Sequence, residues 1–132
     1  MDLDRTPAQI SNAAAEEIRT LNHRILDPKV FETPADVSDT TVGVAAVVQR
    51  LPQALQQLEA GLKALDDGQR IRLADRHPSE VSQQDLSDAV TTVLVGLQEA
   101  RRALGQVEEH LRSATGVLGS LGAPWPEDDG ED

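Results

Sequence analysis

The sequence predicts an all-α fold, a three-helix up-down-up bundle dominated by a long antiparallel coiled-coil hairpin. Aromatic side chains are nearly absent, with one Phe, one Trp and no Tyr among 132 residues. The core must therefore be built from Leu, Val, Ile and Ala, as in helical bundles. Repeated helix-start signals and long runs of heptad-spaced apolar residues are the other two observations that favour this class.

Three helix starts are indicated by capping residues. The stretches "TPAQ" from Thr6 and "TPAD" from Thr33 each place Thr at the N-cap, Pro at the first helical position and an acceptor side chain three residues after the cap. Ser82 is the third N-cap, and Asp85 is its partner in a capping box.

Helix ends are indicated by Pro and Gly. The first helix should stop at Asp27-Pro28, the second at Gly68 in a left-handed cap, and the third before Pro124. We therefore expect helices at 7–26, 34–66 and 83–121, with a loop at 68–81.

Apolar residues of the second and third helices recur at alternating steps of three and four, which is the period of a coiled-coil seam. The loop between these helices is short compared with the helices, so they should fold back on one another as an antiparallel hairpin. The predicted seam consists of Val44, Val48, Leu51, Leu55, Leu58, Leu62 and Leu65, and of Leu86, Val90, Val93, Leu97, Ala100, Leu104, Val107, Leu111, Ala114, Leu118 and Leu121.

Pro52 lies inside the second of these helices. A proline there costs about 3 kcal/mol, yet the heptad phase continues through it. We expect Pro52 to lie just outside the seam and to bend the second helix around the third. A helix break with a restart, or a functional hinge, are the alternatives.

The length fits one domain with a modest core. We expect residues 1–123 to form this domain and residues 124–132, which end in "EDDGED", to form a disordered acidic tail. The last turns of the third helix extend past the second, and apolar residues flank the seam. A homodimer would cover both, so we expect one.

The charge of the chain excludes several classes of function. A net charge of −11 argues against direct nucleic-acid binding and against docking on anionic membranes. No apolar stretch approaches the length of a membrane span, and the N-terminus has no signal-peptide core. The absence of cysteine removes disulfides and thiol chemistry and fits a cytoplasmic protein.

No motif in the chain predicts catalysis. The histidines His23, His77 and His110 belong to neither an HExxH motif nor the ExxH pairs of di-iron bundles, and there is no GxSxG or phosphate-binding loop. We therefore expect a protein that is not an enzyme and has no catalytic residue, no cofactor and no metal site.

Two segments are candidates for binding a partner. The hairpin loop "GQRIRLADRHPSE" concentrates Arg70, Arg72 and Arg76 on an acidic protein; the alternative is a solvated loop whose arginines pair with carboxylates. Trp125, between two prolines, is either a docking anchor or a cap over the end of the bundle.

The stretch "AAAEEIRTLNH", followed by "TPADVSDTTVGVAAVVQRLPQALQQL", resembles a group of small all-helical actinobacterial proteins, often of mobile or plasmid-like elements. Members carry a similar helix ending in "LNH", then "PADV" and "RLPQ" ahead of a long hairpin. The resemblance covers roughly residues 13–58. It implies a bacterial accessory protein and transfers no functional residue.

These observations favour a non-enzymatic helical interaction protein, an adaptor, accessory or regulatory subunit, that binds a protein partner through its coiled-coil faces and its basic loop. One alternative is an acidic mimic of nucleic acid that masks a DNA-binding partner. Another is a secreted helical hairpin similar to the WXG-type proteins, although the turn between these helices lacks the Trp of that group.

Overall fold

The computed structural model describes residues 1–126, which form three long helices and no strand. They are α1 (Pro7–Arg24), α2 (Pro34–Asp67) and α3 (Gln83–Leu118), with the short 3-10 helices η1 (Pro28–Val30) and η2 (Pro78–Glu80) in the two connections. The predicted all-helical class is confirmed. Residues 124–126 form neither helix nor strand, and the remainder of the predicted acidic tail, 127–132, lies outside the described residues.

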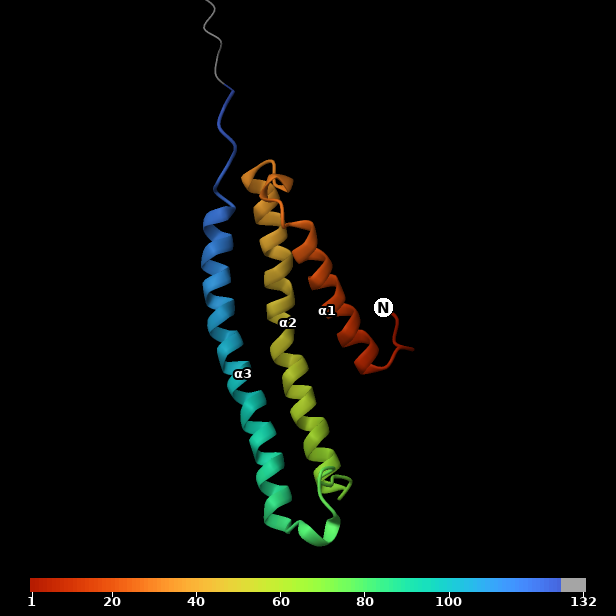
Figure 1. Cartoon of the computed structure of the whole chain (residues 1–132). Coiled ribbons are helices and arrows are strands. Elements are labelled where there is room, and N and C mark those ends of the chain that lie inside the picture. The colour runs from red at the N-terminus through yellow and green to blue at the C-terminus, as the bar shows by residue number, and fades with distance from the viewer. Residues whose placement is uncertain (127–132) are drawn as a thin grey trace, which may run out of the picture.

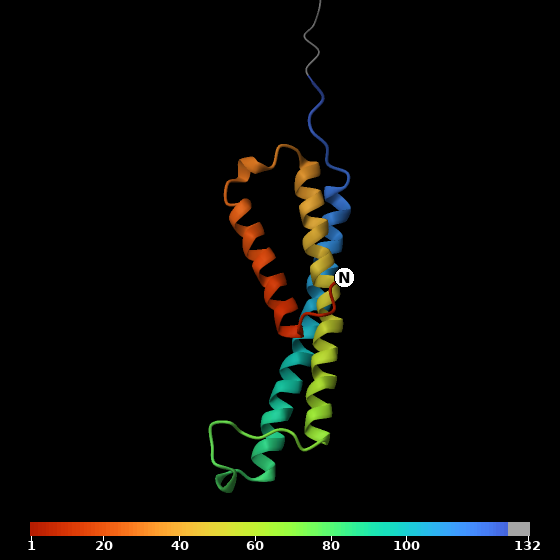
Figure 2. The ribbon, with the colours of Figure 1, turned by 90° about the vertical axis from the view of Figure 1, so that its right-hand side faces the viewer.

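The helices are arranged as a long hairpin with one helix leaning away from it. α2 and α3 run antiparallel side by side and make the main tertiary interface. α1 leans across the N-terminal half of α2, where Ile18 and Leu21 line a shallow hollow with α2, and the two helices are not parallel (Figures 1 and 2). The described chain is therefore a hairpin with a splayed first helix, and α1 does not pack along the hairpin over its length.

The predicted capping residues begin all three helices. The Thr6 hydroxyl accepts from the Gln9 N–H at 3.2 Å, and the Thr6 N–H donates to the Gln9 side chain at 2.9 Å. Ser82 and Asp85 form the same reciprocal pair at 3.0 and 3.1 Å. At α2, Asp36 Oδ2 accepts from the Thr33 N–H at 3.0 Å and also from the Glu32 N–H at 2.8 Å.

The helix ends depart from the prediction by one to three residues. α1 stops at Arg24 and α3 at Leu118, both earlier than expected, whereas α2 continues through Asp67. Gly68 is not left-handed: its φ is −80° and its N–H donates to the Ala64 carbonyl at 3.1 Å. The reversal falls on Gln69, with φ of 54°. The helix therefore continues one residue further than predicted before the chain reverses.

The hairpin seam is rotated relative to the predicted one. Every second predicted position is correct. Leu86 is also half-buried as predicted, whereas Leu65 and Leu121 are exposed and no buried residue follows them. The other predicted positions, within 44–58 of α2 and 93–114 of α3, are each replaced by the next residue along the chain. These replacements are buried or half-buried, while Leu58 and Val93 of the predicted seam are 57% and 49% exposed. The observed seam is Thr41, Ala45, Val48, Pro52, Leu55, Glu59 and Leu62 of α2, and Val90, Leu94, Leu97, Arg101, Leu104, Glu108, Leu111, Thr115 and Leu118 of α3.

This rotation places Pro52 in the seam, where it is half-buried, and not outside it as predicted. α2 nevertheless remains one continuous helix through the proline and changes direction near its middle (Figure 1). The expected bend is therefore present. Pro52 has no N–H to donate to the preceding turn, and the lost hydrogen bond accounts for a bend at this point.

The hairpin has very little buried core. Among the described residues only Ala45 and Val90 are buried hydrophobic side chains, and Glu59 is the one buried charged residue. No helix within residues 1–126 combines the length and the apolar character needed to cross a bilayer.

Candidate interaction surface

The three arginines predicted to bind a partner all lie exposed in the hairpin loop. Arg76 is the one of them with an ion pair, its Nη1 lying 3.9 Å from Asp85 Oδ2 with both side chains about half exposed. Such a contact contributes little stability. Arg70 and Arg72 remain available to a ligand, so the loop keeps its predicted character as a basic, accessible segment.

Asp85 connects this loop to the start of α3. The pKa of the Asp85 carboxyl is lowered, mainly by the hydrogen bond from the Ser82 backbone N–H and next by hydrogen bonding with the Ser82 side chain. The charge of Arg76 lowers this pKa further, whereas desolvation opposes the shift without cancelling it. The carboxylate is thus held in its charged form at the N-terminus of the helix, where negative charge is favourable.

Trp125 lies beyond the end of α3 and is 92% exposed. It therefore does not cap the bundle end at Leu118 and Leu121, which was one of the two expected roles. The basic loop and the segment that follows α3 are at opposite ends of the hairpin (Figure 1). The structure does not bring the two predicted recognition elements together.

A larger candidate surface comes from the rotated seam. In heptad notation the observed seam occupies positions a and d, and the displaced apolar residues occupy position g of both helices. Position g of each helix in an antiparallel pair lies on the same side of the pair. These residues therefore form one exposed apolar strip, the open face: Leu51, Leu58, Leu65, Val93, Ala100 and Val107.

The open face is well exposed along its whole length. Leu58 is the most exposed at 57%, and Leu51 is the least exposed of the large residues at 38%. The adjoining position c contributes only small residues: Ala54, Gly61, Ala89, Gly96 and Ala103. An apolar strip of this kind on a single chain indicates an interaction site.

No charged or polar side chain occurs at positions g and c between residues 44 and 107 of α2 and α3; each is Leu, Val, Ala or Gly. The charged residues of the two helices over this range all lie at the other positions. Two of them, Glu59 and Arg101, are in the seam itself. The charge of the hairpin is thus kept away from its open face.

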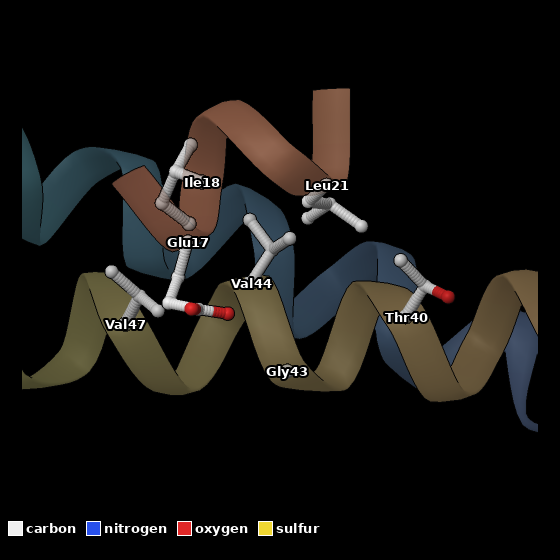
Figure 3. A pocket seen from close by; sticks show the side chains of 7 residues that line it. All are labelled: Glu17, Ile18, Leu21, Thr40, Gly43, Val44 and Val47. Atoms are coloured by element: carbon white, nitrogen blue, oxygen red, sulfur yellow. The ribbon is translucent and has the colours of Figure 1, made fainter. Parts of the chain in front are cut away.

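α1 covers only the end of the hairpin next to the open face. Ile18 and Leu21 of α1 lie over Val44 of α2, and the Glu17 side chain extends toward Val47 (Figure 3). These residues line a shallow hollow of about 370 Å³. Ile10, nearer the start of α1, is 39% exposed. α1 therefore leaves the open face from Leu51 onward uncovered.

The seam beneath the open face contains a buried ion pair between α2 and α3. Arg101 Nε lies 2.7 Å from Glu59 Oε2, and Arg101 Nη2 donates to Glu59 Oε1 at 3.2 Å. The shorter contact is an ion-pair distance without hydrogen-bond alignment. The Glu59 side chain is 4% exposed and that of Arg101 is 33% exposed. This pair links residues 42 positions apart and favours one register of the hairpin.

The arrangement offers extended surfaces for contact with another molecule. Nowhere in residues 1–126 do three His, Cys, Asp or Glu side chains gather where they could hold a metal ion. Comparisons of the chain with protein-family models, with curated proteins and with solved structures give no match.

The heptad pattern of the sequence predicted that the residues of the open face are apolar and lie along the hairpin, but it placed them in the seam between the two helices and not on the exposed side. It placed Leu58 and Val93 inside the hairpin because the d/g and a/d stripes have the same period. The absence of charge at position c is the sequence feature that could have distinguished the two stripes. A helix that is covered on one side needs apolar residues only at positions a and d, so uncharged residues at c indicate a second apolar side.

Proposed function

We propose that this protein is a non-enzymatic interaction module, an adaptor, accessory or regulatory subunit, that binds other protein chains through the open face of its hairpin. The observation that carries the proposal is a continuous, uncharged strip of exposed Leu and Val on a chain of net charge −11. Leaving such a strip in water is unfavourable by about 25 cal/mol for each Å² of apolar surface, and a bound partner removes that cost.

The basic loop is a second contact in this proposal. Arg70 and Arg72 lie exposed at the end of the hairpin and would give the complex an orientation. The resemblance to small actinobacterial proteins supports an accessory role of this kind in a bacterium. The lack of cysteine supports a cytoplasmic location.

The proposal is tested by capturing partners on tagged full-length protein that carries a photo-crosslinking residue at Leu58 or, as control, at Gln57. Both side chains are exposed on α2, but only Leu58 belongs to the open face. A specific protein crosslinked at Leu58 and absent at Gln57 is expected. Equal capture at both positions, or none, would contradict binding through this face.

The contribution of the loop is measured in the same assay with Arg70, Arg72 and Arg76 changed to Ser. We expect weaker capture of the same protein, because the loop adds charge-dependent contacts to an apolar interface. Capture unchanged by the triple substitution would assign all recognition to the open face. Removal of residues after Ala123 tests Trp125 in the same way.

An acidic mimic of nucleic acid is the second candidate, and the net charge of −11 favours it. This mechanism predicts a basic partner whose affinity falls steeply with salt, because charges exposed to solvent are screened. Binding through the open face predicts the opposite, since burial of apolar surface depends little on moderate salt. A salt titration of the captured complex separates the two mechanisms.

A further inference from the structure

We infer that the open face binds a second copy of this chain, so that two hairpins pack face to face and form a four-helix core. This inference rests on the proposed function and names the partner. It is argued from the exposed area of the chain, from the position of its charges and from two glycines that have no neighbours.

The single chain exposes far more surface than a compact protein of its size. Its accessible area is 10839 Å², whereas a compact monomer of 14.2 kDa exposes roughly 6,800 Å². Residues 1–6 and 119–126, which lie outside the helices, and the splayed α1 account for part of the excess of roughly 4,000 Å². A standard dimer needs only about 800 Å² from each chain, so the hairpin has enough unused surface for one.

The distribution of charge favours a second copy over an oppositely charged partner. Two chains of net charge −11 repel one another, and they can pack closely only where neither carries charge. The open face and the small residues beside it satisfy this condition. A basic partner would instead be met by carboxylates, and none lies at positions g and c between residues 44 and 107.

No close packing within the single chain requires glycine at Gly61 or Gly96, as is also true of Gly43, Gly105 and Gly116. Each lies inside a helix, where glycine costs about 1 kcal/mol relative to alanine. A side chain added at either would have no atom within 4 Å to meet. Both flank the open face, one on each helix, where a glycine allows a second helix to approach closely.

The strip also has the symmetry that a pair of identical chains requires. α2 contributes Leu51, Leu58 and Leu65 as a row of large side chains, and α3 contributes a row of smaller ones. When two hairpins pack about a two-fold axis that lies in the interface parallel to the helices, the leucine row of each chain lies over the smaller row of its partner. Large residues then meet small ones across the interface, which fills it without voids.

The test uses two substitutions of the same residue type on the same helix. Val93 and Val95 are each 49% exposed, but Val93 lies on the open face and Val95 points away from it. The molar mass of the full-length protein, Val93→Asp and Val95→Asp is measured by sedimentation equilibrium over a range of concentrations. We expect a concentration-dependent dimer for the unmodified chain and for Val95→Asp.

For Val93→Asp we expect the dissociation constant to rise at least about 100-fold, because the dimer would bury an unpaired carboxylate. Its helix content measured by circular dichroism should not change, since Val93 is half exposed in the single chain. An unmodified chain that stays monomeric, or equal effects of the two substitutions, would overturn the inference.

A second measurement covers the case in which Val93→Asp does not fold. The chain has no cysteine, so a single spin label can be attached at Leu58→Cys or at Gln57→Cys. The label at 58 should lose mobility as the protein concentration rises, while the label at 57 should not. Loss of mobility independent of concentration would mean that the chain covers its own face, and it would contradict a second copy.

The two proposals fail in different ways. A monomeric chain whose Leu58 position crosslinks a different protein would overturn the dimer and leave the interaction module intact. A dimer that forms through the open face and engages no other protein would support the inference and remove the adaptor role. A monomer that captures nothing at Leu58 would overturn both.

Discussion

The hairpin buries charged side chains in its seam and exposes apolar side chains on its open face, which is the reverse of the usual distribution in proteins. In the seam, Glu59 and Arg101 are shielded between α2 and α3, with the carboxylate side chain only 4% exposed. On the open face, one residue earlier along each helix, Leu58 is 57% exposed and Ala100 is exposed as well. The same short shift around each helix axis thus separates a buried ion pair from a solvent-exposed leucine.

This difference shows that the hairpin is only part of a packing unit. The apolar stripe of each helix is centred between positions d and g, and the contact between the helices is centred between a and d. Half of each stripe faces the partner helix and half faces solvent. Such stripes are typical of helices that have a neighbour on two sides, as in a four-helix bundle.

Removal of the arginine from the seam should have the largest effect on stability. Arg101→Met leaves the buried Glu59 carboxylate unpaired, and we expect a loss of about 3 kcal/mol in the free energy of unfolding, measured with urea. This value is at the low end of the range for removing one partner of a buried ion pair, because a third of the Arg101 side chain is exposed.

The control for that substitution is the double variant Glu59→Leu/Arg101→Met. It replaces both partners by apolar side chains, and we expect its stability to lie within about 1 kcal/mol of the original. If the single and double variants lose the same amount, the ion pair is not what holds Glu59 in the seam.

Truncation of one leucine on each side of the hairpin gives the next largest effect. Leu55→Ala, in the seam, should cost about 2 kcal/mol, whereas Leu58→Ala should cost less than about 1 kcal/mol in dilute solution. Thermal unfolding followed by circular dichroism measures both. If the chain dimerises through the open face, the cost of Leu58→Ala grows with protein concentration; equal costs at every concentration would remove the distinction between the two sides.

Alanine in place of glycine compares the open face with a position away from it. Gly96 adjoins the open face and Gly105 does not, and neither has an atom within 4 Å of an added side chain. Each substitution should stabilise the single chain by about 1 kcal/mol through helix propensity. At high concentration the gain at Gly96 should shrink while that at Gly105 persists. A gain at Gly96 that does not depend on concentration would argue against close helix approach there.

The turn that joins the two helices offers a smaller gain. Gln69 is in the left-handed conformation with φ of 54°, which costs a residue other than glycine about 1 kcal/mol. Gln69→Gly removes this cost, but glycine also gives the unfolded chain more conformational entropy, which offsets part of the gain. We therefore expect the free energy of unfolding to rise by about 0.5 kcal/mol. Gln69→Ala is the control and should give no gain; an equal gain would assign the effect to the lost side chain.

The smallest effect is a pH dependence at the start of α3. Because the pKa of Asp85 is lowered by folding, its contribution is present above the unfolded value of 3.8 and is lost as the pH falls through the lower folded value. The melting temperature of Asp85→Asn should therefore lie slightly below the original at neutral pH. The two should coincide well below pH 3.8. A difference that persists in acid would rule out the carboxylate charge as its cause.

The sequence by itself determined the helices of this protein. The caps at Thr6 and Ser82, the prolines at first helical positions and the heptad steps predicted three helices and the residue at which each begins, because these signals act within a few residues of where they occur. The same steps also identified the apolar residues of both stripes, including Leu58 and Val93.

Only the tertiary structure decided which half of each stripe is covered. A heptad period gives the width of an apolar stripe but not its orientation toward a neighbouring helix, because a rotation by one residue changes the contacts and keeps the period. Glu59 and Arg101 meet across 42 positions of sequence, and no local signal could pair them. α1 has an apolar face of its own and yet makes no extended interface with the hairpin, which no local signal in its sequence could indicate.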